Sequence, residues 1–468
     1  MPNSLNSTNS SHSSLNQSSS LTQWLQHLES LHPQVIDMGL ERVEKVASQL
    51  ALGPNNAIKI IVGGTNGKGS TCAMLEAILL AAGYKVGLYT SPHLVHYNER
   101  IRINGENAND ALIVRQFSLI DQKRAGISLS YFEFSTLAAL TAFYEAEVDV
   151  MLFEVGLGGR LDAVNIIDAD CSIITSVDID HIDYLGNDRE HIAWEKAHIF
   201  RADKPAICSD PLPPAAIKAY ADEIGADLWQ FGVDFNYSGD AQQWAFAGRA
   251  QRRAALAYPA LRGVNQLLNA SAALAALEAL RQQIVVPASA VREGLARATI
   301  PGRMQILPGQ PFVVLDVAHN PHAAGALAQS LQQMPMGPDS KTFAVVGMFK
   351  DKEVAAVIAR LLPYVDTWLC ATLEGPRALS AQELSDIVNT ALTTPEIIHN
   401  KESEKVVAPP TVRPKNTWVN KEQVQTLVFD DVVQAFVKAQ ALATDNDRIL
   451  VFGSFFTVGP VLSHLGRL

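Results

Sequence analysis

The stretch 60–71, IIVGGTNGKGST, combines residue types that can hold a phosphate. An apolar run, IKIIVGG, leads into a glycine-rich loop with one lysine, and the amphipathic segment CAMLEAILLAAG follows. The N–H groups of such a loop and the N-terminus of the next helix attract phosphate. We expect Lys68 to reach the outer phosphates of a nucleotide and the hydroxyl of Ser70 or Thr71 to hold Mg²⁺. Gly69 stands where a Ser or Thr usually follows the lysine.

Acidic residues gather after two later apolar runs. Glu154 follows VDVMLF and precedes VGLGGR. A carboxylate at the end of a strand near a phosphate loop commonly holds Mg²⁺, directly or through water. The run SIITSVDIDHIDYLG contains Asp178, Asp180, His181 and Asp183, which would repel one another unless a cation lies among them. We therefore expect His181 to be a metal ligand or a general base.

Three further residues have less local support. In WEKAHIF, Lys196 is predicted from its neighbours to be a solvated surface lysine. Asp316 ends the apolar run FVVLD, and Arg303 follows a rigid Pro-Gly turn. An arginine at such a turn can make bidentate contact with ATP phosphates when two domains close. The alternative is an arginine exposed in a surface turn.

Apolar strands alternate with helical segments before and after the turn IPGR at 300–303. This alternation predicts a mostly parallel sheet with helices on both faces, followed by a second α/β unit. We expect a disordered tail over 1–20, a first domain over 21–300 and a smaller second domain over 301–468. The segment 401–425 is predicted to be a surface insertion without function. Ligands of such sheets collect at the carboxyl ends of the strands.

The 468-residue chain has a formal net charge of -11, which argues against sequence-independent binding to nucleic acid. Its four scattered cysteines form neither a metal-ligand spacing nor a disulfide framework, which fits a reducing cytoplasm. No apolar run approaches the ~20 residues of a membrane helix. The first twenty residues resemble neither a secretory signal nor an Arg-rich transit peptide.

Seven motifs in order resemble the dihydrofolate synthase/folylpolyglutamate synthase family of the Mur-type amide ligases. They are GTNGKGS at 64–70, TSPHL at 90–94, EVGLGGRLDA at 154–163, DH at 180–181, EKA at 195–197, PGR at 301–303 and DVAHNPHA at 316–323. The resemblance spans residues 21–468. It implies a P-loop ATPase-like first domain and a smaller, Rossmann-like second domain. The glycine after the phosphate-loop lysine is usual in this family.

The resemblance also implies a role for individual residues. The expected ATP contacts are Thr65, Asn66, Gly67, Lys68, Asn269, Arg303 and Asp316. The expected Mg²⁺ ligands are Ser91, Glu154, His181 and a carbamylated Lys196. The expected pterin contacts are Ser130, Tyr131, Phe132, Glu133, Leu161, Asp162 and Ala163. The expected catalytic residues are Lys68, His181 and Lys196, with His181 positioning groups rather than acting as the base.

The implied reaction activates a carboxylate with ATP and joins it to the amine of L-glutamate. The substrates would be dihydropteroate and reduced folates, and the enzyme would be a cytoplasmic monomer. A cell-wall Mur ligase is disfavoured because the segment before the phosphate loop is short and polar. A GTPase-type switch is disfavoured because no evident Asn-Lys-x-Asp run is present. The sequence leaves open whether both synthase activities are present.

Overall fold

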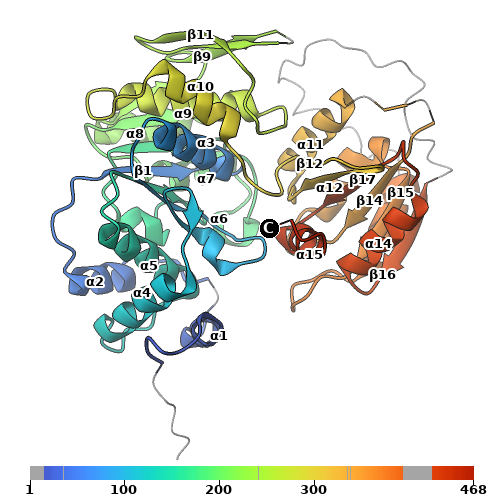
Figure 1. Cartoon of the computed structure of the whole chain (residues 1–468), viewed down its shortest axis with the longest axis horizontal. Helices are drawn as coiled ribbons and strands as arrows, with labels where there is room; N and C mark the ends of the chain where they lie inside the picture. The colour runs from blue at the N-terminus through green and yellow to red at the C-terminus, as the bar shows by residue number, and fades with distance from the viewer. Residues whose placement is uncertain are drawn as a thin grey trace, which may run out of the picture.

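The computed structural model describes residues 15–34, 36–240, 242–334, 336–337, 339–393 and 424–467. These residues form two α/β domains, each around its own large sheet, visible as two lobes in Figure 1. Residues 1–14 of the expected tail and 401–423 of the expected insertion lie outside the described residues. Residues 15–20 lead directly into the first helix, where Ser20 forms a capping box with Gln23.

An eight-stranded sheet organises the first domain, in the order β4-β3-β2-β5-β1-β6-β7-β8. The strands from β2 to β8 in this order are parallel to their neighbours, and β3 and β4 add an antiparallel edge. The expected mostly parallel sheet is confirmed. The strand bounds are β1 Ile58–Gly63, β2 Val86–Tyr89, β3 Ile101–Ile103, β4 Glu106–Asn107, β5 Val150–Glu154, β6 Cys171–Ile174, β7 Pro205–Cys208 and β8 Asp227–Gln230.

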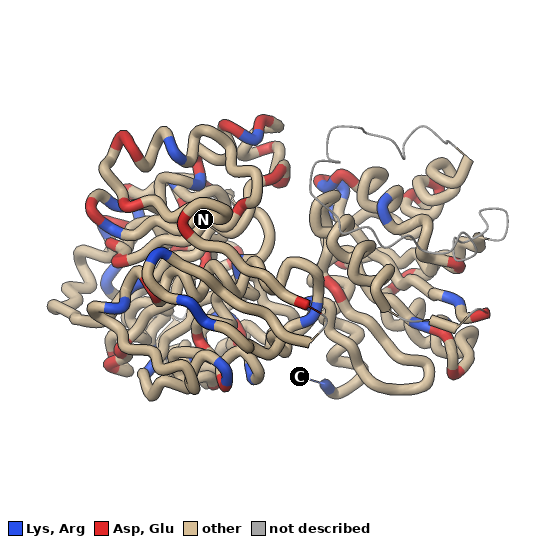
Figure 2. Tube along the Cα trace, turned by 90° about the horizontal axis from the view of Figure 1, so that it is seen from above, with Lys and Arg blue, Asp and Glu red and all other residues tan. Residues whose placement is uncertain are grey.

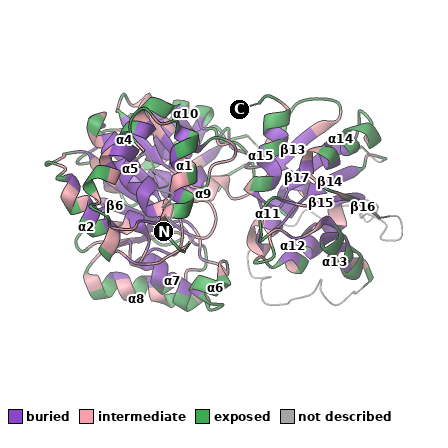
Figure 3. Cartoon of the chain, turned by 90° about the horizontal axis from the view of Figure 1, so that it is seen from below, coloured by how far each residue is buried: buried purple, intermediate pink, exposed green. Residues whose placement is uncertain are grey.

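The central strands are mostly apolar because both faces of the sheet are covered. Successive side chains of a strand point to opposite faces. Accordingly, Ile61 and Phe153 join one apolar cluster, with residues of α1, α2, α4, α5, α7 and α8. Ile60 and Leu152 join a second cluster on the other face, with residues of α3, α9 and α10. Figure 3 shows the buried residues along the strands and on the inward sides of the helices.

The helices of the first domain include two short 3₁₀ segments. Their bounds are α1 Leu21–Leu31, α2 Glu41–Leu50, α3 Lys68–Ala81, η1 Tyr97–Arg100, α4 Asp110–Lys123, α5 Tyr131–Glu145, η2 Ala163–Ile166, α6 Ile182–Leu185, α7 Arg189–Ala197, α8 Ala215–Ile224, α9 Gln266–Ala279 and α10 Ala288–Arg297.

A three-stranded antiparallel sheet, which was not predicted from the sequence, lies beside α9. It consists of β9 Asn236–Gly239, β10 Trp244–Ala247 and β11 Arg252–Leu256. Trp244 and Phe246 point from β10 into the apolar cluster under α9, which explains why a short, mostly exposed sheet is stable. All four cysteines of the chain are buried and unpaired.

The second domain has a six-stranded sheet in the order β12-β13-β17-β14-β15-β16, parallel except for β12. Apolar clusters cover both faces, one under α11, α12 and α13 and the other under α14 and α15. The bounds are β12 Gln305–Leu307, β13 Phe312–Asp316, α11 Pro321–Gln333, β14 Thr342–Val346, α12 Val354–Leu361, η3 Leu362–Tyr364, β15 Thr367–Ala371, α13 Ala381–Thr393, β16 Gln425–Phe429, α14 Val432–Leu442, β17 Arg448–Phe452 and α15 Phe455–His464.

Acidic and basic residues are interspersed over both domains (Figure 2). Within the described parts of the chain, no helix is long and apolar enough to cross a membrane.

Candidate active site

The phosphate loop has the predicted strand–loop–helix arrangement. β1 ends at Gly63, and α3 begins at Lys68, earlier than the amphipathic pattern suggested. Gly64 has φ +135, and a Cβ there would lie 2.0 Å from the hydroxyl of Thr175, so only glycine fits. The Lys68 amine donates to the carbonyls of Gly64 (3.0 Å) and Thr65 (3.2 Å), which holds the lysine across the loop. The backbone N–H groups of the first turn of α3 therefore lie at the same loop as the Lys68 charge, where both can bind a phosphate.

The hydroxyls of Ser70 and Thr71 are both buried. The Thr71 hydroxyl has no hydrogen-bond partner among the described residues.

Glu154 ends β5 beside β1, as expected from the sequence, and is 5% exposed. One carboxylate oxygen accepts the backbone N–H of Ser91 at 3.4 Å, so two of the expected metal ligands adjoin. Burial raises the pKa of Glu154, and the charges of Lys68 and Arg303 oppose that rise. A carboxylate buried between two cations fits a site that handles both phosphate and a metal ion.

The acidic cluster after β6 is resolved differently from our expectation. Lys352 of the second domain supplies the cation, with its amine 2.7 Å from Asp180. Asn320 also donates to Asp180, at 3.0 Å. Despite burial, the charges and hydrogen bonds around Asp180 hold the pKa of that carboxyl well below its usual range. Asp183 is exposed.

His181 is half-buried, with φ 54. Burial lowers the pKa of its imidazole to about 4, with Lys352 and Lys68 adding to the fall and Asp180 opposing it. The ring is therefore neutral near pH 7. A neutral imidazole can ligate a metal but makes a weak base at that pH.

Lys196 is not a surface lysine, and the prediction from its neighbours was wrong. It lies in the last turn of α7 and is 5% exposed. Burial, and then the charge of Lys68, lower the pKa of Lys196 to about 7, while Asp180 and Asp162 oppose this. The lowered pKa makes the neutral amine accessible near pH 7. A neutral, buried amine can react with carbon dioxide, which an exposed lysine resists.

The second domain contributes Arg303 and Asp316, both half-buried. The Arg303 guanidinium lies between the charges of Asp316 and of the first domain's Glu154. The Asp316 carboxylate accepts the N–H groups of Met304 and Ala318, each at 2.8 Å, and so fixes the turn around Arg303. The guanidinium lies over Phe455 at 4.8 Å from the ring centroid, and its Nη1 makes no hydrogen bond within the described residues. The alternative of an exposed surface arginine does not hold.

Asn269 approaches the phosphate loop from α9. A Cβ on Gly67 would lie 2.5 Å from the side-chain oxygen of Asn269. The amide also donates to Gln266 at 3.1 Å. The structure therefore brings the expected ATP contacts of α9 and of the loop together.

Hydrogen bonds connect the phosphate loop to the second domain. The Asn66 amide nitrogen donates to the oxygen of Asn320 at 3.3 Å and lies 2.9 Å from Nδ1 of His322. The TSPHL loop also reaches across, because Leu94 packs against the apolar cluster under α15. A Cβ on Gly459 would lie 2.2 Å from the Leu94 carbonyl oxygen.

The expected pterin contacts lie at the start of α5 and in the glycine loop after β5. Ser130 and Glu133 form a capping box at the N-terminus of α5. Tyr131 stacks edge-on against Tyr97. The Phe132 ring covers Gly156, where a Cβ would lie 2.6 Å from it.

Asp162 organises the glycine loop between Leu161 and the buried Ala163. Its carboxylate accepts the N–H groups of Gly156, Leu157 and Val164 at 2.8–3.0 Å. Burial raises the pKa of Asp162 to about 6, and these bonds oppose the rise. The structure thus gives Asp162 a part in shaping the loop that the sequence did not reveal.

The segment between α1 and α2 also contacts the start of α5 and the glycine loop, and the sequence did not predict these contacts. Arg42 joins Asp37 (2.8 Å) to Glu133 of the capping box (3.2 Å). Met38 would lie 3.7 Å from a Cβ on Gly158. The charged pattern DMGLER at 37–42 could have suggested an ion-pairing segment. Nothing in the local sequence, however, connects it to Glu133 or Gly158.

Lys68 is the electrostatic centre of the site, since its charge acts on Glu154, His181, Lys196 and Asp162. Among the described residues, no three His, Cys, Asp or Glu side chains gather as a metal site. The expected ligand set accordingly depends on the Ser91 hydroxyl and on a carbamate at Lys196 for its other oxygens. Oxygen ligands of this kind suit Mg²⁺.

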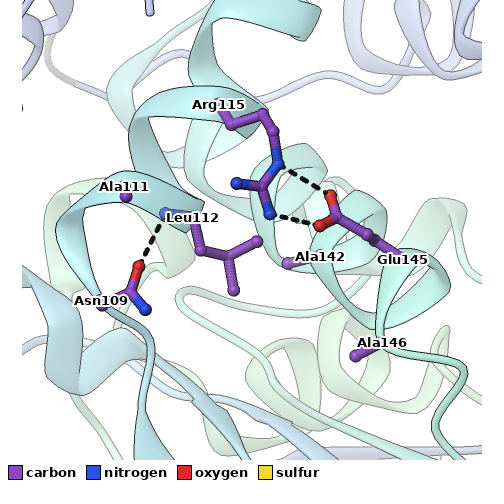
Figure 4. Close-up of a pocket in the computed structure, with 7 residues that line it drawn as sticks. All are labelled: Asn109, Ala111, Leu112, Arg115, Ala142, Glu145 and Ala146. Atoms are coloured by element: carbon purple, nitrogen blue, oxygen red, sulfur yellow. Dashed lines mark hydrogen bonds and ion pairs between the residues drawn. The ribbon is translucent and has the colours of Figure 1, made fainter.

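A shallow hollow between α4 and α5 lies apart from these residues (Figure 4). An ion pair between Arg115 and Glu145 lines it, with Asn109 capping α4 at its side. None of the expected site residues borders it.

Comparison with known proteins decides the family. Residues 62–277 match the Mur ligase middle domain and residues 302–455 match the Mur ligase glutamate ligase domain. A dihydrofolate synthase/folylpolyglutamate synthase of Escherichia coli is 44% identical over 444 residues, 95% of each chain. The Haemophilus influenzae protein of the same name is 37% identical and covers 95% of this chain and 97% of its own. The chain belongs to the dihydrofolate synthase/folylpolyglutamate synthase family.

Solved structures of this family agree with the fold. An Escherichia coli structure in complex with DHPP and ADP has 42% identity and a TM-score of 0.85, over 97% of this chain and 99% of its own. A Yersinia pestis structure complexed with AMPPNP and Mn has 41% identity and a TM-score of 0.83, over 97% and 100%. The predicted fold class and ligase class are confirmed, as are ATP and a divalent cation as cofactors.

Proposed function

We propose that this dihydrofolate synthase/folylpolyglutamate synthase adds L-glutamate to dihydropteroate and further glutamates to reduced folates. The observation that carries the proposal is the convergence of Lys68, Glu154, His181 and Lys196 at the edge of the sheet where Arg303 enters from the second domain. The pterin contacts lie on the first domain, next to this group. A related structure has Mn, AMPPNP and L-glutamate bound, which supports the assignment of glutamate as co-substrate.

The chemistry begins with a carboxylate, which is a poor electrophile because oxide is a poor leaving group. Transfer of the γ-phosphoryl group of ATP to this carboxylate gives an acyl phosphate and ADP. The unprotonated amine of glutamate then attacks the acyl carbon, an amide bond forms, and phosphate leaves. Lys68 leaves the carbonyls of Gly64 and Thr65 and neutralises charge that builds up on the phosphoryl oxygens.

The residues around this group each have a proposed task. Ser91, Glu154, His181 and the carbamate on Lys196 would hold Mg²⁺, which would supply further positive charge at the phosphates. Asn66, Gly67 and Thr65 position the phosphates through the loop. Arg303 contributes a second fixed cation, because its Nη1 has no hydrogen-bond partner within the described part of the chain.

Asp316 holds the Arg303 turn, and Asn269 contacts the nucleotide from α9. Closure of residues 301–468 onto 21–300 excludes water, which would otherwise hydrolyse the acyl phosphate.

The pterin ring binds between the start of α5 and the glycine loop. Phe132 offers a flat apolar surface, and Ser130, Tyr131 and Glu133 surround it. Leu161, Asp162 and Ala163 form the opposite wall. We further propose that the protein is a monomer and that it is cytoplasmic. The four buried, unpaired cysteines support the cytoplasmic location.

Two assays on the purified protein test this function. ADP formation is measured with L-glutamate and either dihydropteroate or tetrahydrofolate. Turnover with both substrates, strictly dependent on glutamate, is expected. Turnover with one alone would reduce the proposal to a single synthase activity, and glutamate-independent turnover would contradict it.

A further inference from the structure

The last turn of α7, which carries Lys196, is fastened to the glycine loop by an unusually close contact. A Cβ on Gly159 would lie 2.7 Å from the carbonyl oxygen of Glu195 and 3.0 Å from the Cα of Lys196. The backbone N–H of Arg160 donates to the same Glu195 carbonyl at 2.9 Å. The backbone of the loop therefore lies directly on the backbone of Lys196.

A side-chain pair reinforces this contact. The Arg160 guanidinium donates to Glu195 from Nη2 at 2.9 Å and from Nε at 3.2 Å. The Glu195 side chain is only 9% exposed, whereas Arg160 is 36% exposed. The guanidinium also lies over the Trp194 ring, 5.1 Å from its centroid. Arg160 thus holds both residues that precede Lys196 on α7.

A third connection closes the far side of the same loop. Arg201 donates to the carbonyl of Asn165 at 2.8 Å and to the carbonyls of residues 198–200, which follow α7. The Asn165 side chain returns a hydrogen bond to the carbonyl of Arg160 at 3.0 Å. The expected pterin contacts 161–163 lie between these two arginines in the sequence.

We propose that Arg160 and Glu195 are positioning residues that set Lys196 relative to the glycine loop. They touch neither ATP nor the reacting carboxyl. They act by fixing the Lys196 backbone, so that its amine stands where carbamylation and metal contact can occur. This inference rests on the proposed role of Lys196. An ordinary stabilising ion pair would affect folding but not the modification.

Carbamylation of Lys196 requires only carbon dioxide and the neutral amine. The neutral Lys196 amine attacks carbon dioxide, a nitrogen–carbon bond forms, and one proton leaves to solvent. The product carries its negative charge on the two new oxygens. Equilibration of the protein with ¹³C-bicarbonate therefore labels the carbamate for ¹³C NMR without any turnover.

The test compares Arg160→Gln, Glu195→Gln and the double variant with the unchanged protein. Each single variant is expected to lose most of the labelled carbamate signal and to lower kcat between about 10- and 100-fold. The KM for ATP should stay within about twofold. The double variant should be no worse than either single one, because the two residues act as one unit. Arg160→Lys should recover part of the signal, since lysine restores one charge contact without the fork.

Arg249→Gln is the matched control for loss of an ion pair. Arg249 also pairs with two acids, Asp227 (2.6 Å) and Asp234 (2.9 Å), and lies over a tryptophan at 4.3 Å. Its removal should lower thermal stability as Arg160→Gln does, with carbamate signal and kcat unchanged.

A second variant does not depend on the ion pair. Gly159→Ala keeps every charge but forces the Lys196 backbone away from the glycine loop. Gly325→Ala is its control, because a Cβ on Gly325 would lie more than 4 Å from any described atom outside its own helix. Only Gly159→Ala should reduce the carbamate signal.

The results distinguish the positioning role of Arg160 and Glu195 from the proposed role of Lys196. A wild-type signal that survives in Arg160→Gln, Glu195→Gln and Gly159→Ala would overturn the positioning role and leave the role of Lys196 intact. A wild-type protein without a carbamate signal would overturn both. Equal losses in Arg249→Gln would attribute the effect to general destabilisation and also overturn the inference.

Discussion

Replacement of Gly67 by alanine separates two contributions of the phosphate loop. Gly67 is the N-cap of α3, with φ 94 and ψ -12, a conformation that other residues rarely adopt. The backbone strain of an alanine there is about 1–3 kcal/mol. In addition, its Cβ would lie 2.5 Å from the Asn269 oxygen, so Asn269 must move. The move sacrifices the hydrogen bond to Gln266, worth about 0.5–1.5 kcal/mol.

The expected total is a loss of about 1.5–4.5 kcal/mol in the free energy of unfolding. The proposed hydrogen bond from Asn269 to ATP is also lost, which corresponds to about a tenfold rise in the Kd for ATP. Calorimetric titration with a non-hydrolysable ATP analogue measures the Kd. Differential scanning calorimetry measures the stability.

Gly83→Ala is the matched control. Gly83 has φ +90, but a Cβ there meets nothing within 4 Å. This variant should show the strain alone, with reduced stability and an unchanged Kd. If Gly83→Ala weakens ATP binding as much as Gly67→Ala, general destabilisation explains both results and the Asn269 argument fails. Unchanged ATP binding in Gly67→Ala would refute it directly.

Four further outcomes follow from the site. Lys68→Ala should abolish ligation while the far-UV circular dichroism spectrum stays unchanged, because one charged contact to the transferring phosphoryl group contributes several kcal/mol; near-normal turnover would refute the assignment. A chain ending at Ile300 should show no glutamate-dependent ATP turnover and still bind dihydropteroate in a fluorescence titration, and full turnover would exclude a role for the second domain. Lys196→Ala should be severely impaired and partly restored by a small carboxylic acid in solution. In the unchanged protein, carbamate occupancy should fall as pH drops through about 7, because protonation removes the neutral amine; occupancy that is flat from pH 6 to 8 would contradict this.

The central strands and the phosphate loop could be predicted because their signals are local. Apolar runs with glycine punctuation fixed β1, β5 and the start of α3, and the ends of these strands identified Glu154. Lys196 could not be predicted from its neighbours, since its burial comes from the glycine loop 37 residues earlier in the chain. Asp180 looked like part of a repulsive cluster because its partner, Lys352, belongs to the other domain. The three-stranded sheet escaped notice because its strands are short and mostly exposed.

Apolar packing stabilises each domain, whereas mainly polar contacts join the two domains to each other. The apolar clusters of the described residues each keep to one domain, except that Leu94 packs on the second. The polar contacts that cross between the domains are few: Asn66 donates to Asn320, and the Asp180 carboxylate accepts from Asn320 and pairs with Lys352. Each contributes only about 0.5–3 kcal/mol, far less than the apolar cores that hold each domain together. The melting of this protein should therefore not be a single cooperative event, and one Tm will not describe it. Bound nucleotide, which contacts both domains, should draw the two calorimetric transitions together.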